Sequence, residues 1–206
     1  MTHDHNVIVS TKREVFTVGH SNHPAERFVE LLAARKTDVV ADVRSQPYSR
    51  YNPQFNKKPL ERTLQEAGMD YCFLGREIGG MPNDDEFYDD DGYVLYRELA
   101  ATERFKRGLA ELKERLEQDR TVIMCAEENP RSCHRGLLIG RELRRVGVTV
   151  IHIRWSGVEE VEPAFDPSGG TGSDEIGGQA SLFGDDPARP WRSLRPAPRR
   201  KRSAKD

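Results

Sequence analysis

The sequence lacks any apolar run long enough to cross a membrane. Its 206 residues are 36% hydrophobic and 32% charged, and no run approaches the roughly 18 consecutive apolar residues that a spanning helix needs. The first dozen residues also lack the apolar segment of a secretory signal. We therefore expect a cytoplasmic protein with one soluble domain, some extra chain length and no membrane partner.

Cysteine is scarce, which excludes a small disulfide-stapled scaffold. The three cysteines are Cys72, Cys125 and Cys133, and an odd, small number cannot form a closed disulfide framework. In a reducing compartment they are core thiols, reactive thiols or metal ligands. Cys72 lies between Tyr71 and Phe73, and this apolar setting favours a core position.

Neither acidic nor basic residues are in large excess, since the net charge is only -2. The two kinds of residue are nevertheless unevenly distributed along the chain. Residues 157–187 carry eight acidic residues and no Lys or Arg, whereas residues 188–206 carry eight basic residues and one Asp. Both segments have too little apolar surface to offset their chain entropy. We therefore expect a folded domain over 12–156, an acidic flexible tether over 157–187 and a basic disordered tail over 188–206.

Within the folded part, short β-branched runs alternate with helical periods. This pattern predicts an α/β fold with an open, mostly parallel, five-stranded sheet flanked by helices. The predicted strands cover 15–19, 39–43, 70–74, 121–125 and 149–153, and the predicted helices cover 24–35, 59–67, 94–118 and 130–146.

Polar residues follow four of these strands. They are His20 and Ser21, Asp42 and Arg44, Gly75 and Arg76, and Cys125 and Glu127. Because ligands bind beyond the carboxyl ends of parallel strands, we expect these side chains to converge on one pocket. In that pocket His20 is a candidate proton carrier, Arg44 and Arg76 are candidate ligand-binding residues, and Asp42 either binds ligand or holds Arg44.

The densest cluster of reactive residue types lies between Met124 and Arg135. Cys133 and His134 are expected near a helix start, where free backbone N–H groups favour a thiolate or an anion. We expect Cys125 or Cys133 to be a nucleophile, His134 or His20 to carry a proton and Arg135 to bind an anion. The alternative is that Cys125 and Cys133 are only buried core thiols. Glu127 and Glu128 argue against a phosphate-cradling loop, and three ligands without a CxxC pair make an imperfect zinc site, so no metal or cofactor is predicted.

The loop after the second predicted strand carries aromatic and basic residues together. Tyr48, Tyr51 and Phe55 alternate with Arg50 and nearby lysines, which offers stacking faces and phosphate partners for a nucleotide or single strand. We therefore include Tyr48 among the ligand-binding candidates. The alternative is a proline-pinned loop whose aromatic side chains pack on the sheet.

Five separated motifs resemble those of the domain of unknown function 488 family. They are residues 18–22, 42–44, 53–56, 74–80 and the segment 124–135, which contains Met124-Cys125-Ala126-Glu127 and Cys133-His134-Arg135. The resemblance covers about residues 14–154. It implies an α/β domain with a polar pocket at these motifs and no established reaction.

The segment 179–183 resembles the short peptide by which bacterial DNA-maintenance proteins bind the replication sliding clamp. Gln179 is expected to hydrogen-bond at the rim of a pocket that Leu182 and Phe183 enter. A chance match, or a staple that folds back on the domain, is the alternative. The basic residues that follow favour nearby DNA or RNA through phosphate contacts.

These observations predict a pocket that acts on, or binds, a nucleotide or nucleic-acid component, with the tail bringing the domain to DNA. Two other hypotheses remain open at this stage. One is a noncatalytic adaptor that recognises a ligand or DNA, and the other is a thiol redox sensor that uses Cys125 and Cys133.

Overall fold

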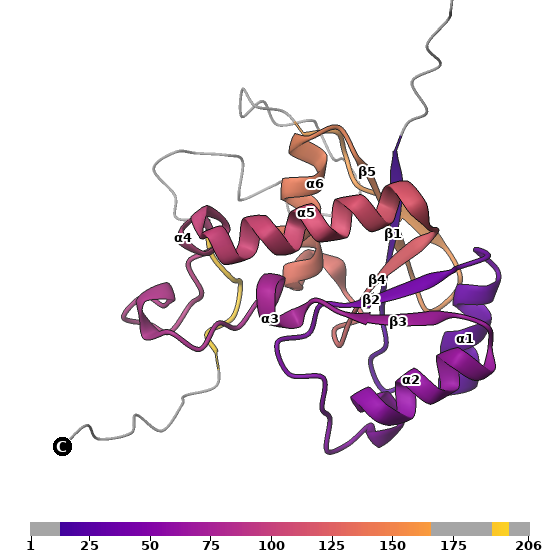
Figure 1. Cartoon of the computed structure of the whole chain (residues 1–206). Helices are drawn as coiled ribbons and strands as arrows, with labels where there is room; N and C mark the ends of the chain where they lie inside the picture. Colours follow the sequence, from indigo (N-terminus) through magenta and orange to yellow (C-terminus); the bar gives the residue numbers. More distant parts are fainter. Residues whose placement is uncertain (1–12, 166–190, 198–206) are drawn as a thin grey trace, which may run out of the picture.

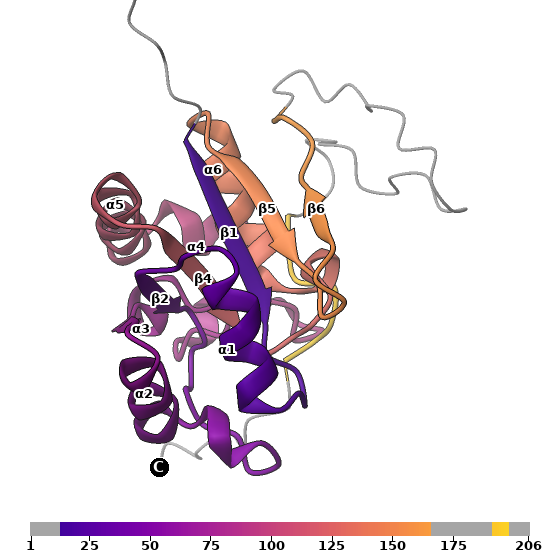
Figure 2. The ribbon, with the colours of Figure 1, turned by 90° about the vertical axis from the view of Figure 1, so that its right-hand side faces the viewer.

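The computed structural model describes residues 13–165 and 191–197 of the chain, and six strands form one sheet through its centre (Figures 1 and 2). The order is β3-β2-β4-β1-β5-β6, in which only β6 runs antiparallel to its neighbour. The strands are β1 Glu14–Gly19, β2 Val39–Asp42, β3 Asp70–Phe73, β4 Thr121–Cys125, β5 Thr149–Ile153 and β6 Glu159–Val161. The predicted mostly parallel α/β sheet is confirmed, with six strands instead of five.

The additional strand lies in the segment predicted to be a flexible tether. The main chain of β6 pairs with β5, with Glu160 opposite His152. Glu159 also forms an ion pair with Arg35, and the Glu162 carboxylate lies 2.7 Å from Nε2 of His152. Arg35 is distant in the chain, and β6 itself is polar and only three residues long, so the sequence pattern did not predict a strand beyond residue 156.

Helices cover both faces of the sheet. They are α1 Ala25–Ala33, α2 Lys57–Glu66, α3 Gly75–Ile78, α4 Tyr96–Ala101, α5 Glu103–Gln118 and α6 Arg141–Arg145. Short 3-10 turns cover Pro53–Phe55, Asp85–Phe87 and Pro130–Ser132, and a π-helix covers Arg135–Gly140.

Two predicted helices are interrupted. The predicted helix 94–118 divides into α4 and α5 at Thr102, whose extended backbone lets its side chain accept a hydrogen bond from the Phe105 N–H and cap α5. The predicted helix 130–146 begins as a 3-10 turn, and Cys133 is extended, so the helix proper starts after Cys133.

Alternating strand side chains build a core on each face. On one face, Met124 packs with the α1 and α2 residues Phe28 and Leu64, and on the other Ile123 packs with Leu112 of α5. This agrees with Figure 1, where α1 and α2 lie on the opposite side of the sheet from α5 and α6. Because both faces are covered, the central strands are continuous apolar runs.

Residues 191–197, which we call the C-terminal strap, lie against the domain, although they were predicted to belong to a disordered tail. Arg192 forms an antiparallel bridge with Leu95, and the indole of Trp191 packs against the core. The predicted clamp peptide, 179–183, lies outside the described residues. No described helix is long and apolar enough to cross a membrane.

Candidate functional site

A cavity of about 660 Å³ lies beyond the carboxyl ends of β1, β2 and β4. The parallel register places Gly19 opposite Cys125 and Asp42 opposite Met124, so the residues that follow these strands meet at one edge. The lining comprises His20, Ser21, Asn22, Arg44, Ser45, Gln46, Tyr48, Ser49, Asn52, Gly80, Met81, Val94, Tyr96, Cys125, Ala126, Glu127, Ser132, His134, Ser193, Arg195, Pro196 and Ala197. Of the eight strand-end residues that the sequence analysis expected in one pocket, five line this cavity, and three do not: Asp42, Gly75 and Arg76.

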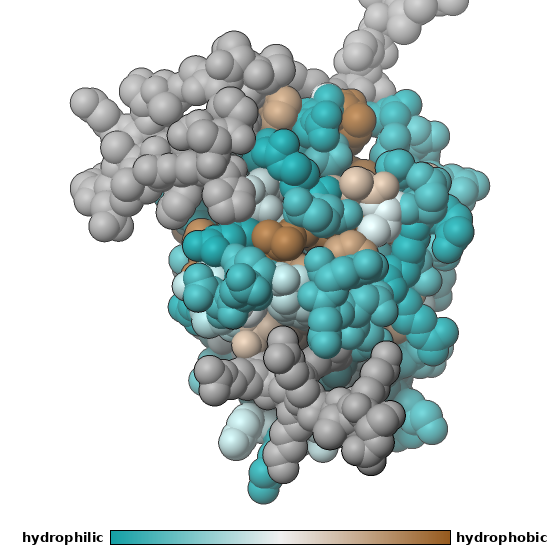
Figure 3. Space-filling view, turned by 90° about the vertical axis from the view of Figure 1, so that its left-hand side faces the viewer, coloured by the Kyte–Doolittle hydropathy of each residue, from teal (hydrophilic) through white to brown (hydrophobic). Residues whose placement is uncertain are grey.

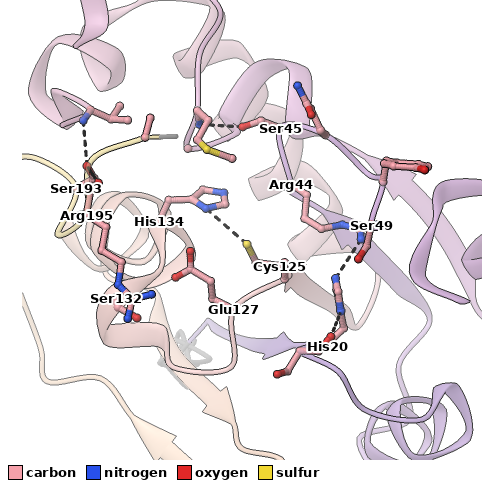
Figure 4. A pocket seen from close by; sticks show the side chains of 18 of the residues that line it. His20, Arg44, Ser45, Ser49, Cys125, Glu127, Ser132, His134, Ser193 and Arg195 are labelled. Carbon is pink, nitrogen blue, oxygen red and sulfur yellow. Dashed lines mark hydrogen bonds between the residues drawn. The ribbon is translucent and has the colours of Figure 1, made fainter. Parts of the chain in front are cut away.

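The Cys125 thiol and the His134 imidazole lie in the cavity wall and point toward each other (Figure 4), and the fully buried Cys133 thiol lies close to both. The Sγ atom of Cys125 lies 3.6 Å from Nδ1 of His134, and Sγ of Cys133 lies 3.9 Å from the same nitrogen. Nε2 of His134 lies 2.9 Å from the Val43 carbonyl oxygen and donates to it. This bond leaves the Nδ1 lone pair of neutral His134 facing the thiols.

The surroundings separate the pKa values of the two thiols. A hydrogen bond from Cys133 lowers the pKa of Cys125, with help from the nearby Arg135 charge, against the opposing effect of burial. Burial and the bond to Cys125 raise the pKa of Cys133 well above its ordinary value. Burial acts to lower the pKa of His134, but its contact with Cys133 outweighs this and raises it. The cluster therefore favours a thiolate on Cys125, and Cys133 keeps its proton.

The same cluster has the donor set of a metal site. The ligand atoms of Cys125, Cys133 and His134 all lie within 4.8 Å of one another. Two thiolates and one imidazole suit zinc, and Cys125 and His134 face the cavity, where a fourth ligand would lie. The Nε2 bond of His134 to a backbone carbonyl also matches the support that metal-bound histidines use.

A buried hydrogen-bonded group lies on the other side of Cys125. Arg44 makes a two-pronged ion pair with Asp42, with contacts of 2.9 and 2.6 Å, and donates to the Phe55 carbonyl at 2.8 Å. Its remaining amino group lies 3.1 Å from Nε2 of His20, whose Nδ1 donates to the Ser21 carbonyl. Asp42 thus holds Arg44, as one sequence-based alternative proposed.

This arrangement leaves His20 without a free nitrogen. Burial and the Arg44 charge lower the pKa of His20 to about 4, so its imidazole is neutral near pH 7. Its ring stacks on Phe55 at a centroid distance of 4.2 Å. The geometry therefore favours His134 over His20 as the proton carrier.

Two predicted ligand-binding arginines do not line the cavity. Arg135 is fully buried and donates to the Glu127 and Glu128 carbonyls and to Thr17, so it holds the loop after β4. Arg76 is exposed on α3, outside the cavity. In contrast, Ser21, Glu127 and the 69% exposed Tyr48 do line it.

The loop that packs over His134 belongs to the motif 74–80, which the family resemblance placed at the pocket, but sequence reasoning missed the wall formed by the strap. Gly80 belongs to that loop, and a Cβ there would lie 2.4 Å from Cγ of His134, so only glycine permits this approach. The strap contributes Ser193 and Arg195. The signal that could have found the strap is Trp191, a large apolar side chain in a basic segment.

A family model described as "Domain of unknown function DUF488" matches residues 24–141. The chain belongs to this family. The DUF488 match includes Arg44, Cys125, Cys133 and His134, begins after His20 and ends before the strap. Neither a curated protein nor a solved structure shows significant similarity to the chain.

Proposed function

We propose that the pocket is the active site of a thiol enzyme in which Cys125 is the nucleophile and His134 is the general base. The observation that carries this proposal is the Cys125 Sγ atom at the cavity wall, 3.6 Å from an imidazole nitrogen whose partner nitrogen is fixed by the Val43 carbonyl. A nucleophile, a base in hydrogen-bond reach and a group that orients the base are the components of covalent catalysis.

The proton of Cys125 moves to Nδ1 of His134, and the resulting thiolate attacks an electrophilic atom of the substrate. A bond forms between Sγ and that atom while the leaving group departs with the proton from His134. Water then cleaves the new bond and restores the Cys125 thiol. Cys133 is a positioning residue, because its thiol donates a hydrogen bond to the Cys125 thiolate.

The proposed substrate is a nucleotide or a nucleic-acid component. Tyr48 is 69% exposed at the cavity and Tyr51, on the same loop, is 86% exposed. Their free ring faces suit stacking with a base, and Arg50 on the same loop is exposed. We keep the proposals of a cytoplasmic location and of a sliding clamp as partner; the latter depends on Gln179, Leu182 and Phe183 alone.

Alkylation of the full chain with iodoacetamide, followed by peptide mass spectrometry, tests the thiol proposal. We expect Cys125 to react first, with a pH midpoint below the usual 9.0 of a thiol. Cys72, whose pKa burial raises, is the internal comparison, and Cys72→Ser should leave the fast reaction intact. Cys125→Ser should abolish it.

Three other outcomes would replace this proposal. Stoichiometric zinc in the purified protein, with Cys125 protected from alkylation until a chelator is added, would assign the cluster to a metal centre. A slow reaction at Cys125, matched by that of Cys72, would favour the noncatalytic adaptor. Rapid conversion of both thiols to a Cys125–Cys133 disulfide by peroxide, with no substrate turnover, would favour the redox sensor.

A further inference from the structure

The C-terminal strap, residues 191–197, is bound to the domain through its main chain. The Ser193 N–H donates to the Val94 carbonyl at 2.9 Å, and the Tyr96 N–H donates to the Trp191 carbonyl at 2.9 Å. The Ala197 N–H donates to the Gly92 carbonyl at 2.8 Å. These bonds fix the register of the strap along the segment that leads into α4.

Side chains also anchor the strap. Trp191 donates from its indole N–H to the Leu137 carbonyl at 2.8 Å, and the Arg141 guanidinium lies 4.3 Å from its ring centroid. Arg192 pairs with Asp89 and stacks over Tyr93. The strap therefore has a defined seat, on a face that is mostly hydrophilic with small hydrophobic patches (Figure 3).

This seat brings Arg195 to the cavity (Figure 4). The figure shows Arg195 beside Ser132 and Glu127, on the opposite side of Cys125 from Arg44. Arg44 is neutralised by Asp42, and four of its five N–H donors are occupied by Asp42, Phe55 and His20. Among the residues that the structure describes, the Arg195 guanidinium is exposed and has no hydrogen bond or ion pair.

We propose that Arg195 makes the pocket an anion-recognising site, so that the substrate carries a phosphate or carboxylate group beside the atom that Cys125 attacks. This inference rests on the proposed thiol function and adds that the substrate is anionic. A guanidinium binds such oxygens through two parallel donors. Glu127 in the same wall would repel the anion, and Arg195 offsets that repulsion.

Two alkylating reagents of similar size test the charge selectivity. Iodoacetate is anionic and iodoacetamide is neutral, so the ratio of their rate constants at Cys125 reports the local field. We expect Arg195→Gln to lower this ratio about fivefold at low salt and less at high salt. Arg195→Lys should retain most of the selectivity, and Glu127→Gln should raise it. Arg62→Gln on the exposed side of α2 is the matched control and should leave the ratio unchanged.

A second measurement does not depend on thiol reactivity. Titration with inorganic phosphate or acetate, followed by the fluorescence of Trp191 in a Trp155→Phe background, should show saturation that Arg195→Gln weakens about fivefold. An unchanged reagent ratio together with unchanged titrations would overturn the role of Arg195 and leave the nucleophile intact. Failure of both reagents at Cys125 with an Arg195-dependent titration would overturn the thiol function and leave the anion site intact. The melting temperature of each variant confirms that it is folded.

Discussion

Arg44 and Asp42 form a buried ion pair whose remaining hydrogen-bonding groups are satisfied. The exposed fractions of their side chains are 5% and 0%, and Tyr71 donates to the second carboxylate oxygen of Asp42 at 2.8 Å. A buried charge is tolerated only when it is paired and hydrogen-bonded. The pair therefore fixes the main chain after β2, from which Ser45 and Tyr48 reach the cavity.

Removing one member of this pair should be more harmful than removing both. We expect Arg44→Met to lower the free energy of unfolding by about 3 to 5 kcal/mol, because Asp42 is left buried without its partner. Urea unfolding measures the loss. The double variant Asp42→Asn/Arg44→Met should regain part of it, and an equal or larger loss in the double variant would contradict this account.

The neutral state of His20 should make stability depend on pH. The pKa of His20 is about 4 in the folded chain against 6.5 for a free imidazole, so the unfolded chain binds the proton first on acidification. Its contribution is complete above pH 6.5 and is lost as pH falls through 6.5 toward 4. The total loss is about 3 kcal/mol.

His20→Gln isolates this effect, since it removes the titrating group and retains a polar side chain. The difference in unfolding free energy between wild type and His20→Gln should shrink by about 3 kcal/mol from pH 7 to pH 4. Urea titrations at several pH values measure it. A constant difference would show that His20 does not titrate between the two states.

At the scale of the elements, the connection from β4 to α6 builds the thiol cluster. A 3-10 turn, the extended Cys133 and a π-helix replace a regular helix there. Arg135 holds the start of the connection by donating to the Glu127 and Glu128 carbonyls. π-helical turns are frequent at functional sites, because they turn side chains away from regular helical directions.

The loop that contains Gly80 should control the orientation of His134. We expect Gly80→Ala to displace the imidazole, because its Cβ would lie 2.4 Å from Cγ of His134, and to slow the alkylation of Cys125 at pH 7 about tenfold. Gly68→Ala is the control. Its φ of +74° makes alanine costly, about 1 kcal/mol, but no atom lies within 4 Å of the added Cβ, so Cys125 should react normally.

At the scale of the whole molecule, the chain combines a pocket at the sheet edge with a tail that contributes to that pocket. The strap lies after residues 166–190, which include the predicted clamp peptide 179–183. The clamp peptide would therefore end about ten residues before the strap residues that line the cavity. Under the proposed clamp interaction, binding of this peptide would hold the pocket close to the clamp.

Replacing Leu182 and Phe183 by Ala should abolish capture of a purified bacterial sliding clamp, because these two side chains supply the apolar contacts of the peptide. Isolated binding should be weak, about micromolar. The melting temperature should not change, and Ser181→Ala is the control. Unchanged capture would remove the clamp as a partner, and a large fall in melting temperature would show that the segment packs on the domain.

Local pattern determined the fold class, the five parallel strands and the residues at their carboxyl ends. Buried parallel strands must be apolar throughout, and such runs are visible without a structure. The same pattern placed His20, Arg44 and Cys125 at one edge, because parallel strands deliver their ends together. The roles of individual side chains were not visible, since Arg135 and Arg44 look equally available in the sequence.

Only the tertiary structure decided which arginine side chains are used in internal hydrogen bonds and which segment forms the last wall of the pocket. Arg135 is buried against two carbonyls, whereas Arg195, from a segment predicted to be disordered, faces the cavity. β6 and the strap are too polar or too short to be stable alone, and their order depends on main-chain bonds with β5 and with residues 92–96. The strap bonds join positions about a hundred residues apart, and the polar sequence of β6 has no apolar alternation, so local periodicity predicts neither segment.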